Sequence, residues 1–168
     1  MSAARAAGFT LIELAVVITL VGILAWLAYP SITSIAELRL DAAARRVASD
    51  IRYAQNRAIG TRTIHGVRFD VGAGRYIVYA GNSGAALVNP ADRGKNLVVT
   101  FAALTETRGV TIESAAFGAT PGLTFDFYGV PRDTAGIELN AAGRVVLQYQ
   151  GTRDTVEVAP QTGAIRVP

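Results

Sequence analysis

The first part of the chain is dominated by one long apolar run. From Phe9 to Tyr29 the sequence reads FTLIELAVVITLVGILAWLAY, in which Thr10, Glu13 and Thr19 are the polar side chains. A helix needs roughly 20 mostly apolar residues to cross about 30 Å of hydrocarbon. The run is apolar on every face, unlike a helix that packs one side on a core. It therefore predicts a transmembrane helix at residues 9–29.

A second helical pattern follows directly and carries apolar residues on one face only. Apolar residues recur at steps of three and four, as on the buried face of an amphipathic helix. These positions are Ile32, Ile35, Ala36, Leu40, Ala43, Ala44, Val47, Ile51, Ala54 and Ala58. The pattern predicts that the helix continues over residues 30–60. We expect a kink, because Pro30 removes a backbone hydrogen bond and Gly22 lowers helix propensity.

After Gly60 the pattern changes to the alternation that is typical of β-strands. Runs rich in Val, Ile, Phe and Tyr are separated by Gly, Pro, Asn and Asp, which favour turns. The predicted strands are residues 64–71, 76–79, 97–101, 110–113, 123–127, 137–139, 145–149, 155–158 and 164–167. Many short strands of this kind favour two packed antiparallel sheets. We predict an α+β fold, in which residues 61–168 form a globular antiparallel β-sandwich that packs against the helix.

Composition narrows the classes of function. The chain has 168 residues and a net charge of +3, whereas proteins that neutralise nucleic-acid phosphates carry a clear basic stripe. No cysteine is present, which excludes disulfides, thiolate metal sites and cysteine nucleophiles. The single histidine, His65, leaves no multi-histidine metal site. Hydrophobic residues reach 51% and charged residues only 17%, in agreement with one concentrated apolar segment.

No group of residues indicates catalysis or a cofactor. The sequence Gly72-Ala73-Gly74 lacks the third glycine and the following helix of a dinucleotide site, and we interpret it as a hairpin turn. Four aspartates offer oxygen ligands for calcium but lack the clustered spacing of a calcium loop. They are Asp92, Asp126, Asp133 and Asp154. We therefore expect a non-enzymatic protein without a cofactor or a metal.

Arginines and carboxylates alternate in the C-terminal third of the chain. The arginines are Arg132, Arg144, Arg153 and Arg166, and the carboxylates among them are Asp126, Asp133, Glu138, Asp154 and Glu157. Mixed charge of this kind favours a solvated surface, so nucleic-acid binding is not the expected function. A DNA-contacting patch remains an alternative if folding gathers the four arginines on one face.

Three interpretations compete for the apolar run. A cleaved secretory signal would require a basic region, a shorter run and a small-x-small site. The sequence offers only Arg5 before the run and no clean Ala-x-Ala before Pro30. A buried core helix is disfavoured, because the run is apolar on every face and too long. A permanent anchor remains, although Arg39, Arg45 and Arg46 after the run would place its C-terminal side in the cytoplasm by the count of positive charges.

Glu13 is unusual within this run. A carboxylate in an apolar helix costs a few kcal/mol in hydrocarbon unless it is paired, so such a residue is a functional candidate by default. The alternative is that Glu13 lies at the depth of the membrane interface and is solvated.

The segment AGFTLIEL at residues 7–14, followed by the apolar run and Pro30, resembles the signal of type IV prepilins and type II secretion pseudopilins. The resemblance implies that residues 1–8 are a leader and that a prepilin peptidase cleaves between Gly8 and Phe9. The new amine of Phe9 would then be methylated. The resemblance also implies a single pass through the bacterial inner membrane, with a cytoplasmic N-terminus and a periplasmic β domain, against the charge count.

The same resemblance implies a role for Glu13 in assembly. In a filament, the positive amine of Phe9 in one subunit lies against Glu13 of a neighbour, so two costly charges become one pair. The implied partners are other pilins or pseudopilins, the prepilin peptidase and the inner-membrane assembly platform. The presence of Glu13 argues against the tip-most type of pseudopilin, which lacks this residue.

Later segments resemble the H-type minor pseudopilin and FimT-like minor pilin family. They are DIRYAQNRA at residues 50–58, LTFDFYGVP at 123–131 and VEVAPQTGAIRV at 156–167. The family folds as an N-terminal helix with a two-sheet β domain, and the lack of a C-terminal disulfide favours a minor subunit over a major pilin. The resemblance implies a structural subunit near the tip of a secretion pseudopilus. The alternatives are a FimT-like or FimU-like minor type IV pilin that primes pilus assembly, a DNA receptor in competence and, last, a membrane-tethered periplasmic enzyme.

Overall fold

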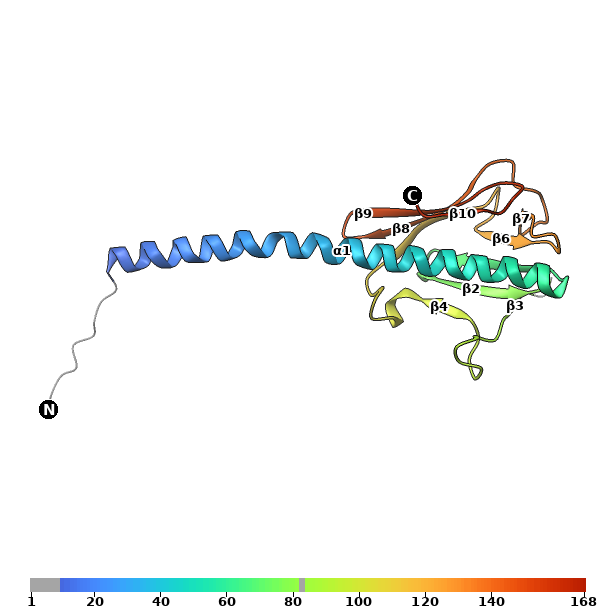
Figure 1. The fold of residues 1–168 in the computed structure, drawn as a ribbon, viewed down its shortest axis with the longest axis horizontal. Coiled ribbons are helices and arrows are strands. Elements are labelled where there is room, and N and C mark those ends of the chain that lie inside the picture. Colours follow the sequence, from blue (N-terminus) through green and yellow to red (C-terminus); the bar gives the residue numbers. More distant parts are fainter. Residues whose placement is uncertain (1–9, 82–83) are drawn as a thin grey trace. The chain divides into compact units, whose positions relative to one another are not determined.

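One long helix and ten strands make up the described part of the chain. The protein is represented by a computed structural model, which describes residues 10–81 and 84–168, with the side chains of residues 27–34 outside the description. Helix α1 (Leu11–Thr61) comes first and all strands follow it (Figure 1). The chain divides into two compact units, Met1–Ile35 and Ala36–Pro168. The second half of α1 therefore belongs to the same unit as the strands.

The strands form two antiparallel sheets, which confirms the predicted α+β class. The first sheet contains β1 (His65–Asp70), β2 (Arg75–Ala80), β3 (Ala85–Ala86), β4 (Val98–Thr100), β6 (Gly122–Phe125) and β7 (Pro131–Asp133). The second contains β5 (Thr111–Ala116), β8 (Gly143–Tyr149), β9 (Thr152–Val158) and β10 (Ile165–Arg166). Their orders are β3-β2-β1-β6-β7, with β4 also paired to β2, and β10-β9-β8-β5. A short 3-10 helix, η1 (Phe101–Ala103), follows β4.

Residues 137–139 do not form the predicted strand. The Asp133 carboxylate accepts a 2.9 Å hydrogen bond from the N–H of Ile137, which closes a turn instead of extending a ladder. Only an isolated bridge joins Glu138 to Arg132. The alternation of Ile, Glu and Leu therefore gave a wrong prediction. Conversely, the sequence does not predict strands β3 and β7, because two or three residues are too few to show an alternating pattern.

The core lies between the second half of α1 and the two sheets. The buried helix positions are Ala36, Leu40, Ala43, Ala44, Val47, Ala48, Ile51, Ala54 and Ala58. They confirm the predicted stripe from Ala36 onward, whereas Ile35 is exposed. Alanine is small enough to let the helix backbone approach the sheets closely. Both sheets contribute fully buried side chains opposite the helix, including Tyr76, Phe125 and Leu147. Removing this apolar surface from water, at about 25 cal/mol per Å², is the main stabilising term.

A buried polar group joins α1 to the first sheet. The phenol of Tyr76 on β2 donates a 2.7 Å hydrogen bond to the carboxylate of Asp50, which also forms a 3.0 Å ion pair with Arg46. Tyr76 is fully buried and Asp50 nearly so. Burial raises the pKa of Tyr76 well above its ordinary value of 10.0, and the adjacent Asp50 raises it further. The phenol therefore remains a donor at neutral pH and fixes the position of the helix against β2.

Side chains of α1 also hold the second sheet and its loops. Arg39 donates to the hydroxyl of Tyr149 at 3.0 Å, and Arg52 donates to the carbonyl of Ile165 at 3.0 Å. Gln55 donates to the carbonyl of Gly129 at 3.0 Å. The second half of α1 is thus a common support for both sheets and for the turn around Gly129.

Candidate assembly surface

Helix α1 begins with a capped turn. The N–H of Glu13 donates a 3.3 Å hydrogen bond to the side-chain oxygen of Thr10, and the N–H of Leu14 donates a 3.1 Å bond to the Thr10 carbonyl. Thr10 is therefore the N-cap and Glu13 the third helical residue, as in the capping-box sequence T-x-x-E. The carboxylate of Glu13 lies in the first turn, where the helix dipole favours negative charge. The spacing of Thr10 and Glu13 is a local signal for this cap, which our sequence analysis did not use.

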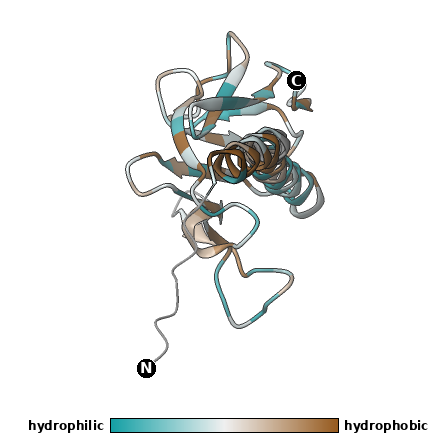
Figure 2. Cartoon of the chain, turned by 90° about the vertical axis from the view of Figure 1, so that its left-hand side faces the viewer, coloured by the Kyte–Doolittle hydropathy of each residue, from teal (hydrophilic) through white to brown (hydrophobic). Residues whose placement is uncertain are grey.

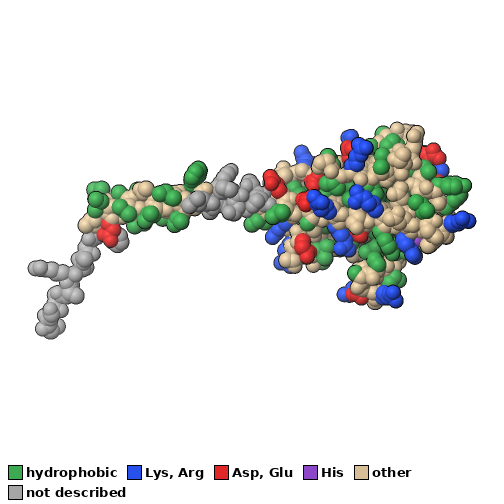
Figure 3. Space-filling model, in the orientation of Figure 1, with side chains coloured by type: hydrophobic (Ala, Val, Ile, Leu, Met, Phe, Trp, Pro, Cys, Tyr) green, Lys and Arg blue, Asp and Glu red, His purple; other side chains and the backbone are tan. Residues whose placement is uncertain are grey.

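The side chains that follow this cap are apolar and exposed. We call residues 11–26 of α1 the apolar segment. Its exposed large hydrophobic residues are Leu11, Ile12, Leu14, Val16, Val17, Ile18, Leu20, Val21, Ile23, Leu24 and Trp26. Because every residue from 11 to 26 is exposed, they lie on every face of the helix. Figure 2 shows the hydropathy along this part of the backbone, and Figure 3 shows the apolar side chains on the side that faces the viewer. The hydroxyl of Thr19 donates to the carbonyl of Ala15 at 2.7 Å, so this polar group is satisfied within the helix.

Several predicted features at this end fall beyond the described residues. The leader at residues 1–8, with Gly8, and the first mature residue, Phe9, lie outside them, and the predicted segment 9–29 ends among undescribed side chains. Within the part of the chain that is described, no helix combines the length and the apolar character that crossing a membrane requires. Helix α1 continues through Gly22 and Pro30, and the kink at these residues stays a prediction.

Three of the four arginines considered for DNA contact share the exposed face of the second sheet, and the fourth lies in the first sheet. Arg132 lies on β7 of the first sheet, whereas Arg144, Arg153 and Arg166 lie on strands of the second sheet. Three of the four form ion pairs: Arg132 with Asp126 and Glu138, Arg144 with Glu157, and Arg153 with Glu113. These carboxylates offset the positive charge that DNA phosphates would require. Folding thus gathers three of the four arginines among neighbouring carboxylates, and DNA contact through them stays an untested alternative.

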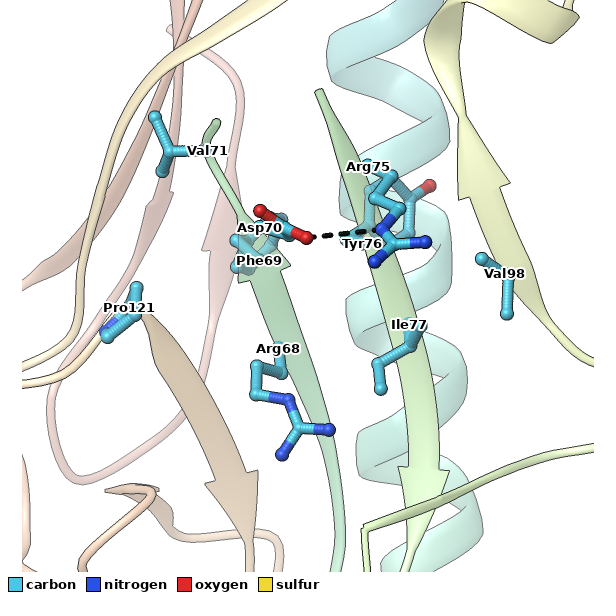
Figure 4. A pocket seen from close by; sticks show the side chains of 9 residues that line it. All are labelled: Arg68, Phe69, Asp70, Val71, Arg75, Tyr76, Ile77, Val98 and Pro121. Atoms are coloured by element: carbon cyan, nitrogen blue, oxygen red, sulfur yellow. Dashed lines mark hydrogen bonds and ion pairs between the residues drawn. The ribbon is translucent and has the colours of Figure 1, made fainter. Parts of the chain in front are cut away.

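A hollow of about 580 Å³ lies on the face of the first sheet that points away from α1 (Figure 4). Its charged side chains are Arg68 and the pair Asp70 and Arg75, whose nearest atoms are 3.2 Å apart. Apolar side chains, including Ile77 and Val98, form much of the remaining wall. No serine, threonine, cysteine or histidine is among the residues that line this hollow.

The residues considered for metal binding have structural partners. The carboxylates of Asp126 and Asp133 each accept backbone N–H groups of the turn that follows. Asp92 pairs with Lys95, and Asp154 accepts the N–H of the next residue. Within the described ranges, no group of three or more His, Asp or Glu side chains is placed to hold a metal ion.

Comparison with known proteins points to one family. Residues 3–29 match the family model described as a prokaryotic N-terminal methylation motif. The chain is 32% identical over 152 residues to the pilin-like protein PilA1 of Thermus thermophilus. That similarity covers 86% of this chain and 94% of the Thermus protein, so it includes both the helix and the β domain.

Two solved structures share the fold. The minor pseudopilin EpsH from the type 2 secretion system of Vibrio cholerae superposes with a TM-score of 0.53 at 13% identity, covering 77% of this chain and 96% of that one. The type IV minor pilin FimU of Pseudomonas aeruginosa superposes with a TM-score of 0.51 at 16% identity, covering 77% and 87%. At sequence identities this low, the similarity shows that the proteins share a fold, which is the arrangement of the helix and the sheets.

Proposed function

Because the chain belongs to the family of type IV pilin-like proteins, we propose that it is a minor pseudopilin of a type II secretion system, located near the tip of the periplasmic pseudopilus. The family and the fold imply assembly with other pilins or pseudopilins. The two solved structures compared here are a minor pseudopilin and a minor pilin, and they support the choice of a minor subunit.

The observation that carries this proposal is the apolar segment, which is exposed on every face within a single chain. Burying a large apolar side chain gains about 1.5–3 kcal/mol relative to leaving it in water. The described unit Ala36–Pro168 has a core of its own, so the apolar segment is not needed to complete that core. Lipid before assembly, and the helices of other subunits after it, would remove these side chains from water.

We place residues 9–29 across the bacterial inner membrane as a single pass, with the N-terminus in the cytoplasm and the β domain in the periplasm. A prepilin peptidase removes residues 1–8 by cleavage between Gly8 and Phe9, and the new amine of Phe9 is methylated. The methylation motif at residues 3–29 supports this processing. The assembly platform then draws the helix into the filament, and a kink at Gly22 and Pro30 would let the helix adjust to its neighbours.

Glu13 has a different partner before and after assembly in this account. In the single chain, Glu13 lies in the capped first turn of α1. There the helix dipole offsets some of the free-energy cost of a carboxylate in an apolar environment. In the filament its charge pairs with the positive amine of Phe9 in a neighbouring subunit. Pairing two charges in hydrocarbon favours lateral assembly over isolated subunits.

The second candidate is a minor type IV pilin that primes pilus assembly, which the fold shared with FimU favours. Deleting the gene in its host separates the two. The pseudopilin proposal predicts the loss of specific proteins from the culture medium while surface pili remain at wild-type number. Loss of pili with normal secretion would contradict it and support the minor pilin. Restoring the wild-type gene must reverse the defect in either case.

A further inference from the structure

Two consecutive turns of the β domain have the same structure. The sequence repeats as DFYGV at residues 126–130 and DTAGI at residues 133–137. In each turn the aspartate carboxylate accepts the N–H groups two and four residues later, at 2.9–3.0 Å. In each turn the glycine, Gly129 or Gly136, has a φ of +81° or +85°. Because this left-handed conformation favours glycine, both turns are defined by their own sequence.

Arg132 lies between the two turns and joins them. Its guanidinium donates to Glu138 at 2.7 Å, to Asp126 at 3.4 Å and to the carbonyl of Gly136 at 3.3 Å. The first turn is also tied to α1, because Gln55 donates to the carbonyl of Gly129. The first turn is therefore held from both sides and presents its side chains from a fixed backbone.

The side chains on this fixed turn are aromatic and exposed. Phe127 and Tyr128 are 47% and 76% exposed, and their ring centroids lie 4.3 Å apart. With Ile59 and Arg62 from the end of α1 they line a hollow of about 590 Å³. We call these four residues the aromatic ledge. The two rings do not contribute to the hydrophobic core, because an aromatic pair that stabilised the core would be expected to point inward.

Arg62 occupies an unusual position on the ledge. It is the first residue after α1 and has a φ of +54°, a conformation that is usually taken by glycine at the end of a helix. The carboxylate of Asp126, which belongs to the turn that carries the two rings, is engaged by Arg132. Among the described residues, no carboxylate forms an ion pair with Arg62. The ledge thus combines apolar surface with an uncompensated positive charge.

We infer that the aromatic ledge is a docking surface for another pilin-like subunit of the same filament, which presents a carboxylate beside apolar side chains. The charge of Arg62 selects the acidic group, and the two rings and Ile59 cover the apolar part. Aromatic residues and arginine are the residue types that most often dominate binding at protein interfaces. The inference rests on the proposed function, because a neighbouring pilin-like subunit is present only if the chain assembles into a filament.

The test is site-specific photo-crosslinking of the full chain in its host. A photoreactive residue replaces Tyr128, and a control replaces Val88, which is 53% exposed in the loop after β3. We expect an adduct from position 128 to another protein with a prepilin signal, at a peptide that contains Asp or Glu. Arg62→Glu should lower its yield about tenfold, because repulsion replaces attraction. Reversing the charge of the partner's carboxylate should restore it.

Other outcomes overturn the inference. They are an adduct with nucleic acid, lipid or a protein that is not pilin-like, a yield that is insensitive to Arg62→Glu, or no adduct at position 128. Recovery of the chain in the filament fraction is measured in the same cells, because incorporation depends on the apolar segment. Normal incorporation without the expected adduct would contradict the ledge and leave the proposed function standing. Failure of incorporation in the unmodified chain would contradict the proposed function itself.

Discussion

We expect that replacing Glu13 with alanine keeps the chain out of the assembled filament while leaving it folded and in the membrane. The reason is the ion pair that we propose between Glu13 and the amine of Phe9 in a neighbouring subunit. Breaking a buried ion pair by removing one partner costs about 3–5 kcal/mol, and each 1.4 kcal/mol corresponds to about a tenfold change in an equilibrium. We therefore expect incorporation to fall by about a hundredfold or more, as measured by the fraction of the chain in sheared or purified filaments.

A second substitution separates the charge of Glu13 from its place in the helix cap. Glutamine is also accepted at the third helical position of a capping box, so Glu13→Gln keeps the cap and removes the charge. Our account predicts that Gln fails as severely as Ala. If Gln assembles normally and Ala does not, Glu13 acts through the first turn of α1 and not through an ion pair. Glu37→Ala, which removes an exposed carboxylate of the same helix, serves as the control.

Asp50→Ala destabilises the β domain without affecting its exposed surface. The substitution leaves the phenol of Tyr76 buried without an acceptor and removes the partner of Arg46. A buried group that loses its hydrogen-bond partner costs about 1–3 kcal/mol, more when a charge is involved. We expect a loss of about 2–4 kcal/mol in the free energy of unfolding, measured by urea denaturation of the chain from Ala36 onward.

Asp41→Ala is the matched control for Asp50. Asp41 also pairs with an arginine four residues away on α1, Arg45, but both side chains are largely exposed. Exposed pairs of this kind contribute about 0–1 kcal/mol. Equal and small losses for Asp50→Ala and Asp41→Ala would contradict the view that the buried group fixes the helix against β2.

The fold could be predicted from the sequence where the signal was local and repeated. The apolar stripe from Ala36 to Ala58 repeats with the helical period over several turns, so the helix and its buried face follow directly. The predicted runs at residues 145–149 and 155–158 lie within the two longest strands, β8 and β9. The strand predicted at residues 137–139 does not form, because the side chain of Asp133 accepts the N–H of Ile137 and closes a turn there.

For the candidate site, too, contiguous motifs could be predicted from the sequence, whereas contacts between distant residues could not. The segment around Gly8, Phe9 and Glu13 is a contiguous motif, so one sequence was enough to find it. The bond between Asp50 and Tyr76 joins residues 26 positions apart on different elements, and no local pattern marks it. The ion pairs of the C-terminal arginines depend likewise on which strands become neighbours. The aromatic ledge was hidden because Phe127 appeared to continue a strand that ends at Phe125.

We propose that this chain is a prepilin-type subunit whose apolar helix enters the filament after processing. The most direct test is the intact mass and the N-terminal residue of the full chain, expressed with and without a prepilin peptidase. We predict a mature chain that begins at methylated Phe9 and appears only when the peptidase is present. A chain that still begins at Met1 in the presence of the peptidase, or one cut near Pro30, would contradict the account.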